Sequence, residues 1–165
     1  MAELTNRERL QPSLLDRLID DDPTNPRESR DSRVLSVERL RLCVLRDLKW
    51  LLNCENLASA VDLDDYPQLA KSVLNFGRPA LSGKSSSSVT LDQIRDQFRQ
   101  AILNFEPRIL PDTLRIIPFT SDEGGSPHLL SFRIEGQLWA QPLPLNLFLR
   151  TELDLETGNI GVYEE

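Results

Sequence analysis

The feature that most constrains this chain is a change of hydrophobic period at Glu106-Pro107-Arg108. Residues 90–105 carry apolar side chains at the three- and four-residue steps of a helix, whereas later segments alternate as strands do. Proline fixes its own φ and disfavours α geometry in the residue before it, so the helix is expected to end near Phe105. Glu106 and Arg108 would then lie on a rigid corner between a helical half and a sheet half. The residues by themselves favour a structural ion pair here, and a docking site for another protein is the alternative.

Three helices are expected before the corner. Residues 12–21 place Leu14, Leu15, Leu18 and Ile19 on one apolar stripe. The strongest amphipathic pattern of the chain starts at residue 32 or 36 and runs to about residue 53. Residues 90–105 open with a capping box, Thr90 followed by Gln93. The first helix is too short to be stable alone, so it either packs on the body or folds on a partner. We therefore expect residues 1–33 to form an N-terminal arm with one short helix, and residues 34–165 to form a single domain.

Three strands are expected after the corner, over residues 114–119, 130–136 and 145–155. Pro118 suits an edge or the end of a strand, because proline cannot donate to a sheet ladder. A turn with positive φ is expected at Gly77 in the connection between the long helices. Helices followed by a meander of strands predict an α+β fold, with N-terminal helices packed on a small, mainly antiparallel C-terminal sheet.

Charge and hydropathy exclude several classes of partner. The 165 residues carry a net charge of −7, which argues against nucleic acid because phosphate binding needs a basic face. No apolar run approaches the roughly 20 residues that cross a bilayer, so we expect no direct membrane insertion. The N-terminus has no apolar segment typical of a secretory signal. The expected location is cytoplasmic.

The residues that usually carry chemistry are sparse. One histidine and two cysteines, eleven residues apart on a helix, offer too few ligands for zinc and too great a separation for a disulfide. Gly83-Lys84-Ser85 lacks the earlier glycine of a phosphate-binding loop, since position 78 is Arg78, and His128 has no nucleophile motif nearby. Arg108 would favour the ionised form of Glu106 and oppose a general-acid role. We expect no enzyme, no cofactor and no metal.

Several segments resemble, in the right order, the TssE family of type VI secretion baseplate subunits. Arg46-Asp47-Leu48-Lys49-Trp50-Leu51-Leu52-Asn53 is similar to that family's R-D-L-x-W-L-L-N segment, and residues 72–77, Ser-Val-Leu-Asn-Phe-Gly, resemble its S-V-L-N-Y/F-G turn. Residues 102–109 are similar to its I-x-x-F-E-P-R-L, and residues 13–18 to its S-L-L-D-R-L helix. Ala80 replaces an acid before Leu81-Ser82, and residues 85–88 are an insertion. The resemblance covers about residues 12–155.

The resemblance implies a structural role. The family is related to phage-tail baseplate wedge proteins and is thought to start assembly of the contractile sheath at the cytoplasmic face of the inner membrane. The implied partners are TssF and TssG of the wedge core, TssK indirectly, and the first sheath ring of TssB and TssC. The implied partner-binding residues are Glu106, Pro107 and Arg108. The family's sheet adds to sheath strands, and residues 145–155 are the candidate strand for that contact.

Two other functions remain as alternatives. One is a peptidoglycan hydrolase, because related proteins were once labelled lysozyme-like. The other is a small regulatory adaptor, because an anti-adaptor family shares the scaffold.

Overall fold

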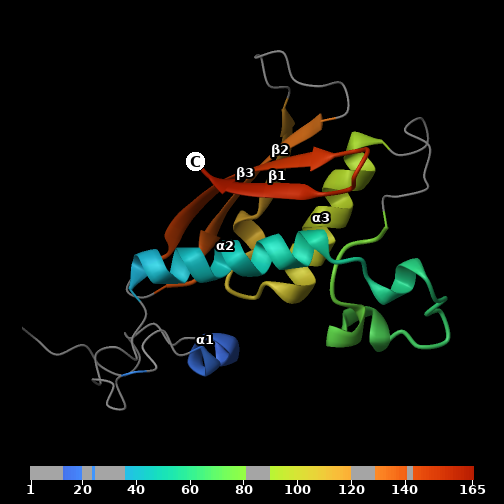
Figure 1. The fold of residues 1–165 in the computed structure, drawn as a ribbon, viewed down its shortest axis with the longest axis horizontal. Coiled ribbons are helices and arrows are strands. Elements are labelled where there is room, and N and C mark those ends of the chain that lie inside the picture. Colours follow the sequence, from blue (N-terminus) through green and yellow to red (C-terminus); the bar gives the residue numbers. More distant parts are fainter. Residues whose placement is uncertain (1–12, 20–23, 25–35, 81–89, 120–128, 141–142) are drawn as a thin grey trace, which may run out of the picture.

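The computed structural model describes residues 13–19, 24, 36–80, 90–119, 129–140 and 143–165. In this part of the chain, helices α1 (Leu14–Leu18), α2 (Val37–Asn53) and α3 (Leu91–Phe105) precede a sheet made of β1 (Arg115–Phe119), β2 (Leu129–Leu138), β3 (Leu145–Asp154) and β4 (Ile160–Glu164) (Figure 1). This order confirms the predicted α+β fold. The division into an arm at residues 1–33 and a domain at residues 34–165 stays a prediction. Gly83-Lys84-Ser85 and His128 lie outside the described residues.

Both long helices begin at a capping residue. Ser36 accepts a hydrogen bond from the backbone N–H of Arg39 at the start of α2. Thr90 and Gln93 form both halves of the predicted capping box at the start of α3. Each cap satisfies backbone N–H groups that the first turn of a helix leaves without a partner.

The sheet is an antiparallel meander in the order β1-β2-β3-β4, and one of its faces packs against α2 and α3. In β2 and β3 the inward positions alternate with outward ones, as a sheet with one buried face requires. The core joins both layers and includes Leu48, Leu52, Phe98, Ile102, Phe132, Ile134, Leu149 and Leu153. Phe98 of α3 and Phe132 of β2 meet edge to face with 5.5 Å between ring centroids.

Two expectations about the sheet are corrected. Residues 160–164 form a strand, β4, that the alternation pattern did not predict, because only Ile160 and Val162 of this segment are apolar and inward. β3, which contains almost all of the candidate strand 145–155, is bonded to β2 on one side and to β4 on the other. It is therefore an interior strand over most of its length, because only Leu145–Leu147 extend past the pairing with β4 and Glu165, and the rest of the candidate strand offers no edge for an added strand. The edges belong to β1, which contains Pro118 as expected of an edge, and to β4.

The side-chain amide of Asn53, the last residue of α2, pairs with the backbone of β4. Its Nδ2 donates to the carbonyl oxygen of Ile160 at 2.8 Å, and its Oδ1 accepts from the N–H of Ile160 at 2.9 Å. Asn159 and Glu165 bond to β3, so by the alternation of an antiparallel ladder Ile160, Val162 and Glu164 direct their backbone groups to the outer side. Asn53 thus occupies the first outward position of this edge as a neighbouring strand would.

Short 3₁₀ turns connect α2 to α3: η2 (Leu57–Ser59), η3 (Leu69–Lys71) and η4 (Val73–Asn75). Gly77 follows them with φ +120°, which confirms the predicted positive φ. A Cβ at this position would lie 2.4 Å from the backbone oxygen of Cys54, so no larger residue fits.

Both cysteines are free: Cys43 is buried and Cys54 is exposed. Within the described residues, no helix has the length and hydropathy to cross a bilayer.

Candidate functional site

The Glu106-Pro107-Arg108 corner is held by backbone bonds on both sides. The N–H of Glu106 donates to the carbonyl of Ile102 at 2.8 Å and closes α3 where Pro107 was predicted to end it. Trp139 then donates to the carbonyl of Arg108 at 2.7 Å, which joins the corner to the end of β2. The corner is therefore fixed to a helix and to the sheet, and its backbone geometry does not depend on a partner.

Glu106 and Arg108 form an internal pair. The Arg108 Nε donates to Glu106 Oε1 at 2.7 Å, Nη2 donates to Oε2 at 2.5 Å, and the Arg108 backbone N–H donates to Oε1 at 3.2 Å. The Glu106 side chain is 3% exposed and that of Arg108 is 21% exposed. A carboxylate whose two oxygens both accept bonds from one guanidinium fixes the orientation of that guanidinium.

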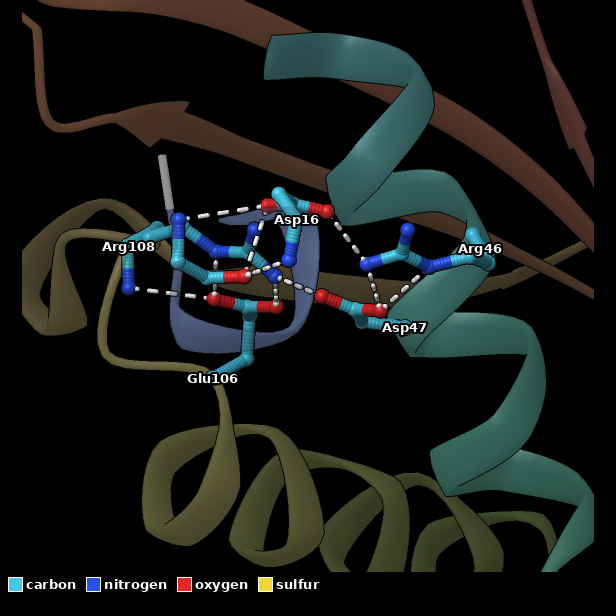
Figure 2. Close-up of polar contacts among 6 residues, drawn as sticks. Asp16, Arg46, Asp47, Glu106 and Arg108 are labelled. Carbon is cyan, nitrogen blue, oxygen red and sulfur yellow. Dashed lines mark hydrogen bonds and ion pairs between the residues drawn. The ribbon is translucent and has the colours of Figure 1, made fainter. Parts of the chain in front are cut away.

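The pair continues into a line of alternating charges drawn in Figure 2. Arg108 Nη2 also contacts Asp47 Oδ2 at 2.5 Å, and Arg46 Nε donates to Asp47 Oδ1 at 2.8 Å. Arg46 Nη2 in turn contacts Asp16 Oδ1 at 2.8 Å. The network thus joins α1, α2 and the end of α3 through Asp16, Arg46, Asp47, Arg108 and Glu106.

Burial and pairing act on the pKa values of this network in opposite directions. Burial alone would lower the pKa of Arg108, but the bonded carboxylates of Glu106 and Asp47 raise it above its ordinary value. Burial would raise the pKa of Asp16, yet hydrogen bonds from Ser13 and Arg46 together with the Arg46 charge lower it to about 2. Both groups therefore stay charged at neutral pH, and the network is a set of ion pairs rather than a proton-transfer site.

A groove of about 460 Å³ lies beside the corner. Aromatic and apolar side chains form much of its lining, and the charges of the corner border it; the lining residues include Leu15, Trp50, Leu51, Phe76, Phe105 and Pro107. Phe76 and Phe105 meet edge to face with centroids 5.4 Å apart. Trp50 is 53% exposed and Pro107 is exposed, while the Arg46 guanidinium lies 5.2 Å from the Trp50 ring centroid. Such a cleft suits an apolar side chain of another molecule better than a small polar substrate.

The three residues predicted as a site are brought together but in different environments. Glu106 and Arg108 face each other inside the network, whereas Pro107 is the exposed member. Sequence reasoning missed Asp16, Arg46, Asp47 and Trp50. Arg46 and Asp47 lie between the apolar steps of their helix, as residues of an outer face do, and periodicity cannot show that an outer face is covered by another element. Asp16 is 30 residues from Arg46 in the sequence, so no local pattern predicts their contact. Among the described residues no cluster of ligands for a metal is found.

Comparison with family models matches residues 38–143 to the model described as baseplate wedge protein gp25. The chain belongs to the baseplate wedge protein gp25 family. This family includes phage gp25 and the TssE subunits of type VI secretion systems. Comparisons with curated proteins and with solved structures gave no significant match. The match contains Arg46, Asp47 and the whole corner, whereas Asp16 precedes it.

Membership of the gp25 family fixes the general role of the chain. The family is structural and non-enzymatic, which confirms that this chain is not an enzyme and excludes the hydrolase alternative. Its members are baseplate wedge proteins of contractile tail assemblies, so the chain interacts with other baseplate or tail proteins.

Proposed function

We propose that this gp25-family protein is the TssE-type subunit of a type VI secretion baseplate, which docks on the wedge core and starts assembly of the contractile sheath. Its partners are TssF and TssG in the wedge, TssK indirectly, and the first ring of TssB and TssC, at the cytoplasmic face of the inner membrane. The finer assignment rests on the resemblance of the Arg46–Asn53, 72–77 and 102–109 segments to the TssE family.

The observation that supports docking at the corner is that its charged side chains are held by other side chains of the chain, whereas Pro107 is exposed. Glu106 and Asp47 hold the Arg108 guanidinium in one orientation, and the exposed Pro107 ring lies beside the Trp50 groove. Because the charges are already paired and the proline is rigid, a partner that binds here orders few side chains on this surface. Glu106 is in this view a positioning residue, and Pro107, Arg108 and Trp50 are the groups a partner touches.

The contact with the sheath is assigned to a strand added at the edge of β4. Strand addition needs outward-directed backbone N–H and C=O groups, and Val162 and Glu164 direct theirs to the outer side. β1 is a poorer candidate because Pro118 in this strand has no N–H to donate.

The test is binding of the full chain to a purified TssF–TssG complex. Pro107→Lys places a long charged side chain at the groove, and we expect binding at least about tenfold weaker, equivalent to the loss of one good contact. Pro111→Lys is the matched control, because Pro111 is also an exposed proline, at the start of η5 (Pro111–Thr113), and both variants lose the same rigidity. Equal binding by both variants would refute docking at the corner. A folded wild-type chain without affinity for TssF–TssG would refute the partner assignment and favour the adaptor alternative.

A further inference from the structure

Helix α1 exposes leucines and buries its acidic residue, which is the reverse of the usual amphipathic pattern. Its leucines Leu14 and Leu18 are 74% and 73% exposed, whereas the side chain of its acid, Asp16, is 3% exposed. A helix that packs on a protein body normally buries its apolar stripe and exposes its acids. The expected apolar stripe is thus present, but α1 directs two of its four members away from the body.

Polar contacts through Asp16 hold α1 in this orientation. Asp16 Oδ2 accepts a hydrogen bond from the Ser13 backbone N–H at 3.2 Å in a capping box and another from the Ser13 hydroxyl at 2.6 Å. Asp16 Oδ1 accepts from Arg46 of α2. A five-residue helix has no stability of its own, so these contacts set both its position and its rotation. Figure 2 shows Asp16 directed toward Arg46, as one member of the charged network.

The remaining apolar residues of α1 lie on either side of this anchor. Leu15 lines the groove beside the corner together with Trp50 and Pro107. Ile19 lines a second groove, of about 500 Å³, with Leu42 and Cys43 of α2. The outward leucines of α1 are therefore continuous, through Leu15, with the surface assigned to docking above.

We propose that α1 is a docking helix, whose Leu14 and Leu18 enter an apolar groove of a neighbouring wedge protein while that protein also covers the Trp50–Pro107 groove. The inference rests on the proposed function of the corner and extends it to a second, helical contact. Leucines four residues apart on one helix face form the pattern by which helix-in-groove interfaces are recognised.

The charges beside α1 define the partner more closely. Of the five charged residues of the network, Asp16, Asp47 and Glu106 are acids, and only Arg46 and Arg108 are bases. This excess is one charge, and it has the same sign as the net charge of −7 of the whole chain, so the groove that receives the leucines is expected to have a basic rim. A second copy of this chain would bring the same excess of acids and is the poorer occupant.

The first experiment measures the dissociation constant of the full chain for the TssF–TssG complex by biolayer interferometry. Leu14→Ser/Leu18→Ser is expected to weaken binding on the order of 30-fold, since both side chains are exposed in the free protein and would be buried in the complex. The matched control is Val73→Ser/Leu74→Ser on η4, another exposed apolar pair at 82% and 65%, which should bind within about twofold of wild type. Circular dichroism of each variant checks the fold.

Several outcomes would overturn the inference. Wild-type affinity of the Leu14→Ser/Leu18→Ser variant would show that α1 is not part of the interface, and an equal loss in the control would show that the effect is not specific to α1. Tighter binding would show instead that α1 covers the corner and has to leave it. A wild-type dimer in sedimentation that the α1 variant abolishes would assign the stripe to a second copy. If Pro107→Lys weakens binding and the α1 variant does not, the proposed function stands and this inference fails; if wild type does not bind, both fail.

A second variant tests Asp16 as a positioning residue. Asp16→Asn keeps the shape of the side chain and removes its charge, so α1 should lose its fixed rotation while Leu14 and Leu18 remain. We expect binding roughly fivefold weaker, a preorganisation effect. We also expect faster alkylation of Cys43, which lies beside Asp16 and Ile19, in a chain that carries Cys54→Ser. The rates are compared at equal fractions of thiolate, because burial and the Asp16 carboxylate both raise the pKa of Cys43. Unchanged alkylation and unchanged affinity would refute the anchoring role.

Discussion

Glu106, Pro107 and Arg108 are consecutive in the chain, yet their side chains lie in three environments. Glu106 is buried, Pro107 is exposed, and Arg108 lies between them with its guanidinium shared by Glu106 and Asp47. At the scale of the residue, a substitution of Glu106 or Arg108 is expected to lower the free energy of unfolding more than it alters the surface that a partner would contact. Variants of Pro107 and Trp50 are therefore better probes of docking than variants of Glu106.

Arg108→Met tests this view of the ion pair. We expect the free energy of unfolding to fall by roughly 3 kcal/mol, because the substitution leaves the Glu106 charge buried without its partner. The measurement is urea denaturation followed by circular dichroism. The double variant Glu106→Gln/Arg108→Met leaves no unpaired charge at this position and should lose clearly less. An equal loss in the single and the double variant would contradict the argument.

At the scale of the element, α1 depends on an ion pair more than on buried apolar surface. The pKa of Asp16 is lowered to about 2 from an ordinary value of 3.8, so the charged form is favoured by its partners in the folded chain. A lowered pKa means that this contribution is complete above about pH 4 and is lost as the pH falls toward 2. α1 should therefore leave α2 in acid while the α2–α3–sheet core, which is apolar, persists longer.

The fluorescence of Trp50, which shares a groove with Leu15, reports this detachment in a chain that carries Trp139→Phe. We expect a change between pH 4 and pH 2 that precedes the loss of far-ultraviolet circular dichroism. Asp47 and Glu106 line the same groove as Trp50, so Asp16→Asn serves as the control and should lack this transition. The same transition in both chains would mean that α1 is not held by the Asp16 charge.

Periodicity and capping were sufficient to predict most of the elements. Thr90–Gln93 set the start of α3, Pro107 set its end, and the alternation of Phe132 and Ile134 identified the core strand β2. β4 was not predicted because a strand with only two inward residues gives a weak alternation pattern, and its stability comes from pairing with β3 and from Asn53, which is 107 residues away in the sequence. For α1 the pattern showed a stripe but not its direction, since the Asp16–Arg46 pair, and not hydrophobicity, orients the helix.

At the scale of the whole molecule, Arg78 joins segments that are far apart in the chain. It is 3% exposed, and its guanidinium donates to the carbonyls of Leu52 at 2.7 Å, Pro79 at 3.1 Å and Gly158 at 2.8 Å. These bonds fix the end of α2 and the β3–β4 turn to the loop that follows Gly77. Burial lowers the pKa of Arg78, although the charge of Glu55 opposes the shift.

Arg78→Met should lower the free energy of unfolding by roughly 3 kcal/mol, because it removes the donor to three carbonyls, one of them in a buried contact. Thermal denaturation by calorimetry is the measurement. Arg95→Met is the control, because Arg95 pairs with Asp92 and Asp96 on the outer face of α3 and such surface pairs contribute little. A loss no greater than that of the control would show that Arg78 does not join these segments energetically.

Asn53 has a consequence for the geometry of any strand that is added to the sheet. Because its amide already occupies the outward N–H and C=O of Ile160, an incoming chain has to start its ladder at Val162. A single asparagine thus determines the register of the added strand along β4. That register also sets the orientation of the protein to which the added strand belongs. The same amide shortens the accessible edge to a length that accepts one short segment but gives little support to indefinite stacking of identical copies.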